Sequence, residues 1–220
     1  MNNSKQIITT GLLLMLFAII GSGLVGTTYE GTKKQIAENE RRAMLRTLNN
    51  ILPANTYDND LINETINLYP DSRLGQTETS VAYQAKKDNI VTAIILPVIA
   101  PDGYAGAIKL LVGIRADETL AGVRVISHKE TPGLGDKIDL VKDSWILAFN
   151  DKDLHNPGTK SWKVKKDGGV FEQFTGATIT PRAVVKAVHR ALDYFNANKN
   201  KLFLNQSEYN QLYGQVANKS

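Results

Sequence analysis

The chain has no cysteine, only three histidines and few aromatic residues, which make up 7% of its 220 residues. Without cysteine there is no disulfide bond, no cysteine-ligated iron–sulfur cluster, no CxxCH haem attachment and no thiol catalysis. The histidines His128, His155 and His189 are scattered and lack a metal-binding spacing such as HExxH, so we expect no protein metal site. These absences exclude thiol enzymes and argue against a metalloenzyme.

Charge of one sign is not concentrated in the sequence either. The formal net charge is +4, from 26 basic and 22 acidic residues that are mixed along the chain. A nucleic-acid-binding domain is expected to show a basic patch or stripe, so we predict no nucleic-acid partner. The composition, with 42% hydrophobic residues and no low-complexity block, is that of an ordinary folded protein.

One long stretch lacks charged residues, between Gln6 and Tyr29. Its core, IITTGLLLMLFAIIGSGLVG (7–26), matches the length of about twenty apolar or small residues with which a helix crosses a bilayer core. A cleaved signal peptide, the alternative, has a shorter apolar region of about 7–15 residues and an A-x-A-like site, which does not follow here. We predict a retained transmembrane anchor over residues 1–28. The Lys and Arg count leans toward a cytoplasmic C-terminal side, but large domains translocate despite their charge.

Residues 29–80 are predicted to form a helical stalk and a connector. Between Glu30 and Leu52, apolar residues recur near helical spacing and charged residues occupy the other face, which is typical of an amphipathic helix. We expect this helix to pack on the domain and to end at Pro53. Residues 54–80 are polar with weak periodicity and indicate a connector with short elements.

Residues 81–220 are predicted to form an α+β domain. Four β-rich runs, VAYQAKK, NIVTAIILPVIA, GAIKLLVGIR and GVRVISHK, lie between Val81 and Lys129 and are separated by short turn signals. Short connections favour antiparallel neighbours. Pro97, inside the second run, indicates an edge or a bulge. A late amphipathic helix, TPRAVVKAVHRALDYFNANK (180–199), is expected to pack on the resulting antiparallel sheet.

The stretch FTGATITPR (174–182) lies just ahead of that helix. Thr180 followed by Pro181 is a good N-cap and first helical residue. Thr178 lies two residues earlier, where free backbone N–H groups and the helix dipole favour an anion. Gly176 and Ala177 leave space beside it. From these residues alone, a small-residue turn that caps a helix is the commoner interpretation.

A second unusual segment is HKETPGLGDKID (128–139), in which Pro132, Gly133 and Gly135 fall within four residues. Such a loop turns tightly, and its backbone can approach a ligand closely.

These segments resemble a known family. TGAT (175–178) is similar to the S/T-G-A-T flavinylation motif of the FMN-binding domains in Rnf and sodium-pumping NADH:quinone reductase complexes. HKETPGLGDKI (128–138), DGYAGAIKLLVGI (102–114) and FEQFTGATITPRAVVKAV (171–188) together resemble the G subunits of Rnf (Rsx) complexes, as do the anchor and the length. One departure is Glu172, where the family usually has Asp. The resemblance spans nearly the whole chain.

The resemblance implies FMN joined to the Thr178 hydroxyl through a phosphoester bond that a dedicated flavin transferase installs. It also implies a role for the residues around Thr178 and for the 128–139 loop, whose Leu134 would supply a wall for the isoalloxazine ring. The expected cofactor-binding residues are Thr178, Thr175, Gly176, Ala177, Thr180, Glu130, Thr131, Leu134 and Gly135. No residue is expected to act as a catalytic acid or base.

The resemblance further implies an electron relay in a bacterial inner-membrane complex that moves electrons between ferredoxin and NAD and couples them to sodium or proton transport. The flavin domain would lie on the periplasmic side, and the other Rnf subunits would be its partners. Two alternatives remain at this point. One is the C subunit of a sodium-pumping NADH:quinone reductase, and the other is a membrane-tethered assembly module without flavin.

Overall fold

The computed structural model describes residues 3–205, 207–208 and 211. It divides into two compact units, Met1–Met44 and Leu45–Ser220. Helix α1 (Asn3–Ile51) makes up the described part of the first unit, and its last two turns belong to the second.

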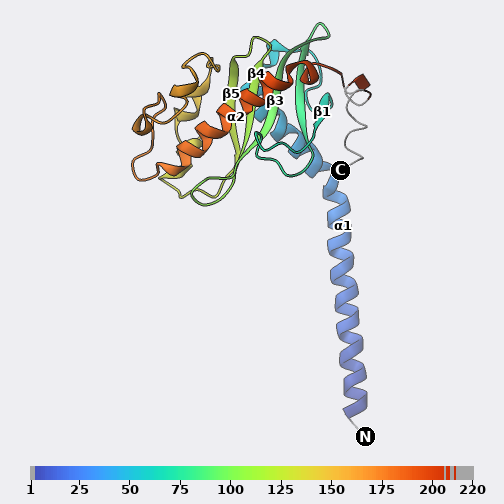
Figure 1. Ribbon diagram of the computed structural model, residues 1–220. Helices are drawn as coiled ribbons and strands as arrows, with labels where there is room; N and C mark the ends of the chain where they lie inside the picture. The colour runs from blue at the N-terminus through green and yellow to red at the C-terminus, as the bar shows by residue number, and fades with distance from the viewer. Residues whose placement is uncertain (1–2, 206, 209–210, 212–220) are drawn as a thin grey trace. The chain divides into compact units, whose positions relative to one another are not determined.

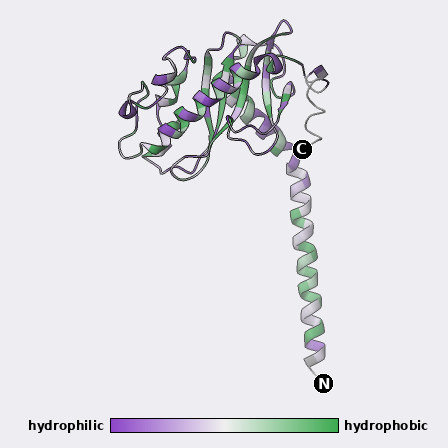
Figure 2. Ribbon diagram, in the orientation of Figure 1, coloured by the Kyte–Doolittle hydropathy of each residue, from purple (hydrophilic) through white to green (hydrophobic). Residues whose placement is uncertain are grey.

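The first unit is one uninterrupted helix. The expected anchor and stalk are therefore parts of the same element, α1, which is 49 residues long. An 18-residue window of α1 has a mean hydropathy of 2.2, and none of it is buried. Figure 2 shows this apolar part toward the N-terminal end of α1. A helix that is apolar and not covered by protein is suited to a bilayer. The expectation of one candidate transmembrane helix is confirmed.

The amphipathic part of α1 is buried only at its end. Ile36 and Ala43, expected on the packed face, are exposed, whereas Leu48 and Ile51 are buried within the second unit. The helix ends before Pro53, as predicted, because proline has no N–H to continue the ladder.

The second unit contains a five-stranded antiparallel sheet with the strand order β1-β2-β3-β4-β5. The strands are β1 (Thr65–Leu68), β2 (Ser80–Lys87), β3 (Ile90–Ala100), β4 (Ile108–Arg115) and β5 (Leu120–Ser127). Each strand pairs with the next along the chain. The antiparallel α+β prediction is confirmed, and β1 is an additional edge strand inside the segment expected to be a connector.

Pro97 lies in the central strand rather than at a sheet edge. The β2–β3 pairing runs only from Tyr83↔Ile95 to Lys87↔Ile90, so Pro97 stands beyond its end and pairs on one side alone, with Leu111 of β4. The missing N–H of proline therefore breaks no ladder hydrogen bond, and locally the prediction of an edge position holds.

Both faces of the sheet are covered (Figure 1). Helix α2 (Ile179–Leu202) packs on one face through its contacts with β3 and β4. The last turn of α1 packs on the opposite face, where a side chain at Gly113 would overlap Ile51. Double coverage explains why the middle of β3, from Ala93 to Leu96, is buried without alternation.

The region between β5 and α2 consists of loops and short 3-10 helices. These are η2 (Gly135–Ile138), η3 (Ser144–Phe149), η4 (Thr159–Ser161) and η5 (Lys165–Asp167), while η1 (Ala54–Thr56) follows α1. An aromatic cluster holds the loops together, with ring centroids 4.6–6.2 Å apart. Its members are Trp145, Phe149, Trp162, Phe171 and Phe174. Both tryptophans are thus core residues, and the cluster ends immediately before the TGAT motif.

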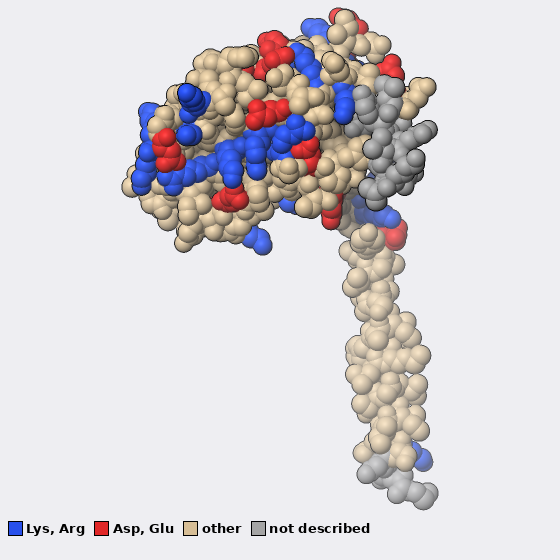
Figure 3. Space-filling view, viewed as in Figure 1, with Lys and Arg blue, Asp and Glu red and all other residues tan. Residues whose placement is uncertain are grey.

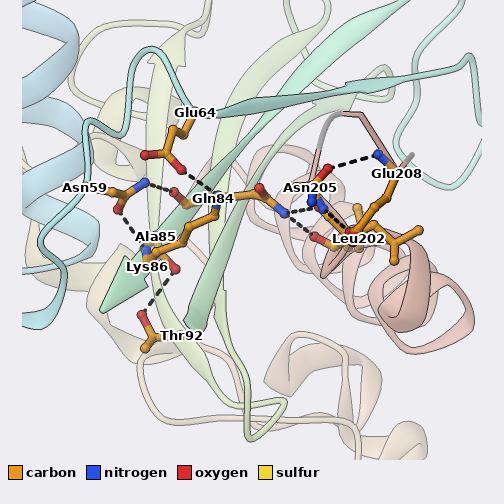
Figure 4. Close-up of polar contacts among 10 residues, drawn as sticks. Asn59, Glu64, Gln84, Ala85, Lys86, Thr92, Leu202, Asn205 and Glu208 are labelled. Carbon is orange, nitrogen blue, oxygen red and sulfur yellow. Dashed lines mark hydrogen bonds and ion pairs between the residues drawn. The ribbon is translucent and has the colours of Figure 1, made fainter. Parts of the chain in front are cut away.

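The C-terminal end of α2 is closed by a side chain from the sheet (Figure 4). Gln84 of β2 is 2% exposed, and its Nε2 donates to the carbonyl oxygens of Leu202 at 2.8 Å and Leu204 at 2.7 Å. The last carbonyls of a helix have no partner within the helix, so Gln84 satisfies groups that would otherwise be buried without one.

Candidate flavin site

A cavity of about 310 Å³ lies at the N-terminal end of α2. Three segments that are far apart in the sequence form its walls: the β3–β4 turn, the loop after β5, and the turn that leads into α2. The lining residues are Tyr104, Glu130, Thr131, Leu134, Gly135, Gly176, Ala177, Thr178, Ile179 and Thr180. The antiparallel connections bring these segments to the same end of the sheet.

Eight of the nine residues selected from the sequence line this one cavity. The exception is Thr175, which is exposed and does not line the cavity. Two lining residues were missed, Tyr104 and Ile179, which are 69% and 47% exposed. Tyr104 lies in the DGYAGAIKLLVGI segment, and a large aromatic residue in a tight surface turn is a signal that could have identified it.

Glu130 joins the three walls. Its side chain is buried, at 4% exposed, and Oε2 accepts a hydrogen bond from the Thr180 hydroxyl. Oε1 accepts one from the backbone N–H of Ala105 at 2.9 Å, while the Glu130 N–H donates to His128 Nδ1 at 3.1 Å. Hydrogen bonds to a buried carboxylate are among the strong ones in proteins. Glu130 therefore fixes the shape of the cavity, with both of its oxygens held by protein donors.

The predicted role of Thr180 as N-cap is wrong. Helix α2 begins at Ile179, with Thr178 in the cap position, so Thr180 lies inside the first turn and is fully buried. The physical reason is that the Thr180 hydroxyl has a stronger partner than a backbone N–H, namely the buried Glu130 carboxylate. Pro181 remains compatible with the helix because first-turn N–H groups have no intrahelical acceptor.

Thr178 has a hydroxyl that the helix does not use. Its backbone is already helical, at φ −71° and ψ −26°, and its side chain makes no capping hydrogen bond. Among the described residues, the N–H groups of Ile179 and Thr180 find no acceptor, and Pro181 has no N–H. A half-buried hydroxyl thus stands beside free helix donors, an arrangement that favours an anionic group.

Two glycines keep the cavity open. A Cβ added at Gly135 would lie 2.8 Å from Thr180 Oγ1 and 2.9 Å from Glu130 Cβ, so any side chain there would displace the Glu130–Thr180 pair. Gly176 has φ +80°, a backbone conformation that residues with a side chain rarely adopt. The loop and the TGAT turn can therefore approach each other closely.

The chemistry of this cavity suits holding a group better than converting one. Tyr104, Leu134 and Ile179 offer partly exposed apolar surface, and the helix end offers donors for a phosphate. The one buried carboxylate that lines the cavity, Glu130, already has protein partners. Within the described part of the chain, no group of three or more His, Asp or Glu residues could hold a metal ion. A phosphate beside Thr178 and a flat ring against the apolar residues fit these walls.

Comparison with known proteins agrees with this geometry. Residues 103–193 match the family model described as FMN-binding domain, and residues 1–51 match the RnfG N-terminal region. The G subunit of the ion-translocating oxidoreductase complex of Pseudomonas aeruginosa is 48% identical over 198 residues, which cover 90% of this chain and 92% of the relative. Its counterpart of the same name from Vibrio cholerae is 49% identical over 192 residues, 87% of this chain and 91% of the relative. That from Pseudoalteromonas atlantica is 46% identical over 205 residues, 93% and 95%.

The chain belongs to the G-subunit family of ion-translocating oxidoreductase (Rnf) complexes. The resemblance found in the sequence motifs is thereby confirmed. All three walls of the cavity lie within the part of this G-subunit chain, residues 103–193, that matches the FMN-binding domain. The cavity at the N-terminus of α2 is therefore its candidate flavin site.

Proposed function

We propose that this G-subunit chain carries FMN covalently on Thr178 and passes electrons through it within a membrane-bound Rnf complex. The observation that carries the proposal is the Thr178 hydroxyl, which lines the cavity of the FMN-binding domain and caps nothing. Bound FMN would supply a redox centre that accepts one or two electrons. The chain itself would position that centre, as expected for a cofactor protein without a substrate site of its own.

Each wall of the cavity has a role in this proposal. The phosphoester keeps one negative charge, which the N-terminal turn of α2 stabilises by about 0.3–1 kcal/mol. Leu134, Ile179 and Tyr104 exclude water from one side of the ring. Glu130 holds the loop, the β3–β4 turn and the helix start in register. The covalent bond keeps the cofactor, and the non-covalent contacts orient it.

The experiment is co-expression with a flavin transferase, followed by ultraviolet illumination of a denaturing gel. We expect a fluorescent band for the wild type and for Thr175→Ala, whose side chain is exposed and outside the cavity. Thr178→Ala should remove the fluorescence completely. Thr180→Ala is a poor control because Thr180 is a buried partner of Glu130.

A fluorescent Thr178→Ala band would contradict attachment at Thr178. A wild-type chain that stays non-fluorescent beside an active transferase would instead support an assembly module without flavin. The alternative of a quinone-reductase C subunit has no comparable support, because the matching relatives described above are G subunits.

We also propose that α1 crosses the bacterial inner membrane once and that the flavin domain lies on the periplasmic side, where other subunits and the transferase reach it. The absence of cysteine makes this testable with one engineered thiol. Val141 is 87% exposed, so Val141→Cys should react with a membrane-impermeant maleimide in spheroplasts. Labelling that requires lysis would place the domain in the cytoplasm.

A further inference from the structure

A second concave site runs along the exposed side of α2, with a volume of about 460 Å³. Trp162, Val164 and Val185, all buried, form an apolar floor. The remaining lining residues are polar or charged: Lys163, Asp167, Arg182, Lys186 and His189. We call this site the α2 groove. It shares no lining residue with the flavin cavity.

Basic side chains gather along both sides of the α2 groove. Arg182, Lys186 and Arg190 follow one another at intervals of four residues and therefore form a row on one side of the helix. Figure 3 shows Lys and Arg side chains in such a row across this face of the domain. On the other side, the segment around η5 adds the exposed Lys163 and Lys166. The fold thus brings together charges that are scattered in the sequence.

Nearby carboxylates balance this charge only in part. Arg182 donates twice to Asp167, at 2.6 Å each, and Lys163 and Lys166 are close enough to lower the pKa of Asp167 further, after the dominant effect of Arg182.

The second carboxylate, that of Asp102, likewise lies among basic side chains. Lys186 Nζ lies 2.7 Å from Asp102 Oδ2, and Arg190 also contributes to a lowered pKa of Asp102. Five cations therefore surround these two carboxylates, and a third, Asp193, lies 3.6 Å from the groove residue His189, which still leaves a positive surplus along an apolar floor.

We propose that the α2 groove docks an acidic segment of another subunit of the membrane complex. An apolar side chain of that segment would pack on Trp162 and Val185, and flanking Asp or Glu side chains would pair with Lys163, Lys166 and Arg190. An apolar centre with a polar rim is the usual anatomy of a protein interface, and complementary rim charges raise its specificity and association rate. The proposal does not depend on flavin attachment at Thr178.

The shape and charge pattern favour a protein over an anionic lipid surface. A groove with a buried aromatic floor fits a protruding segment, whereas a bilayer surface is flat. Asp102 and Asp167 stand on the rim itself, where they would repel lipid phosphates. A protein segment can place its acidic groups against the lysine and arginine side chains and away from these two carboxylates.

The test uses the full-length chain in detergent and the membrane complex purified without this subunit. The groove variant is Lys163→Glu/Lys166→Glu/Arg190→Glu. The control variant, Lys87→Glu/Lys109→Glu/Lys142→Glu, reverses as many charges at exposed positions outside the groove. We expect the groove variant to bind about tenfold or more weakly, with a reduced salt dependence, and the control to bind within about twofold of wild type. Unchanged circular dichroism and flavin fluorescence would show that the groove variant is folded.

Zero-length carbodiimide cross-linking in the assembled complex identifies the partner group. We expect amide bonds from Lys163 or Lys166 to an Asp or Glu of another subunit. Equal binding by the two variants would overturn the proposal. So would a groove variant that loses affinity for phosphatidylglycerol vesicles while it binds the complex normally and gives the same cross-links, because that result assigns the groove to lipid.

Discussion

The two ends of α2 differ in whether the backbone groups left unpaired by the helix find other hydrogen-bond partners. At the C-terminal end, Gln84 satisfies the carbonyls of Leu202 and Leu204, and the end is closed (Figure 4). At the N-terminal end, the N–H groups of Ile179 and Thr180 have no acceptor among the described residues, and the Thr180 side chain bonds elsewhere.

Helix ends that lie inside a protein are normally satisfied by caps or by side chains. One helix with one satisfied end and one open end therefore supports the proposal that a ligand binds at the open end. The open end is the one that contains the TGAT motif and the cavity.

Removal of Glu130 at the open end should cause the largest loss of stability. Glu130→Ala leaves the buried Thr180 hydroxyl and the Ala105 N–H without acceptors, so we expect a loss of about 3 kcal/mol in the free energy of unfolding. Chemical denaturation of the detergent-solubilised chain measures this loss, and the fluorescent gel should show reduced flavinylation. Glu130→Gln keeps part of the network and should cost less.

Glu172→Ala is the matched control for Glu130, because the Glu172 side chain is exposed and, among the described residues, pairs only with the exposed Lys165. It should change stability by less than about 1 kcal/mol. A Glu130→Ala chain that is as stable as Glu172→Ala would mean that Glu130 does not hold the three walls together.

Gln84→Ala should destabilise the closed end of α2 without changing flavin attachment at Thr178. The change removes two hydrogen bonds and leaves one buried and one partly buried carbonyl unpaired, which should cost about 2 kcal/mol. Hydrogen exchange should accelerate in the last turn of α2, while flavinylation at Thr178 stays at the wild-type level.

Gln76→Ala is the control at this end. Gln76 is similarly buried, at 7% exposed, but its Nε2 donates to the Pro97 carbonyl in β3 at 2.5 Å rather than to α2. It should lower stability without faster exchange at the end of α2. Equal acceleration in both variants would show that exchange there reports global stability and that Gln84 has no local role.

The sequence allowed prediction of those features that depend on neighbours in the chain. The four long strands followed from β-rich runs with short turn signals, and their antiparallel order is confirmed. Strand β1 was missed because it is four residues long, lies in a polar segment and buries only Ile66 and Leu68. The motif resemblance also identified most of the cavity wall.

Features that depend on distant residues could not be read in this way. By local pattern Thr180 is a good N-cap, but its partner Glu130 lies 50 residues earlier in the chain. The full basic surface around the α2 groove was missed for a similar reason: helical spacing alone gives the row of Arg182, Lys186 and Arg190, but residues 163–166 lie beside that row only after folding. Both the role of Thr180 and the basic surface depend on residues that are far apart in the sequence.

The smallest expected effect is on the pH dependence of stability, and it concerns two ion pairs that lie near opposite ends of α2. Asp71 accepts from Arg73 at 2.7 Å, and the Arg73 guanidinium lies 5.0 Å from the ring centre of Tyr194 in the C-terminal half of α2. Hydrogen bonding from Arg73 lowers the pKa of Asp71, and hydrogen bonding from Arg182 lowers the pKa of Asp167 near the open end.

A lowered pKa in the folded state means that each pair stabilises the fold above the unfolded pKa of about 3.9, and that this stabilisation disappears as the pH falls through the folded pKa. The Asp71 side chain is 22% exposed and the Asp167 side chain 35%, so solvent screens the second pair more strongly. Asp71→Asn should therefore reduce the loss of stability between pH 5 and pH 2 by about 0.5 kcal/mol, and Asp167→Asn should reduce it less. Urea denaturation across this pH range measures both, and a larger change in Asp167→Asn would show that the pair beside the open end is the more protected one.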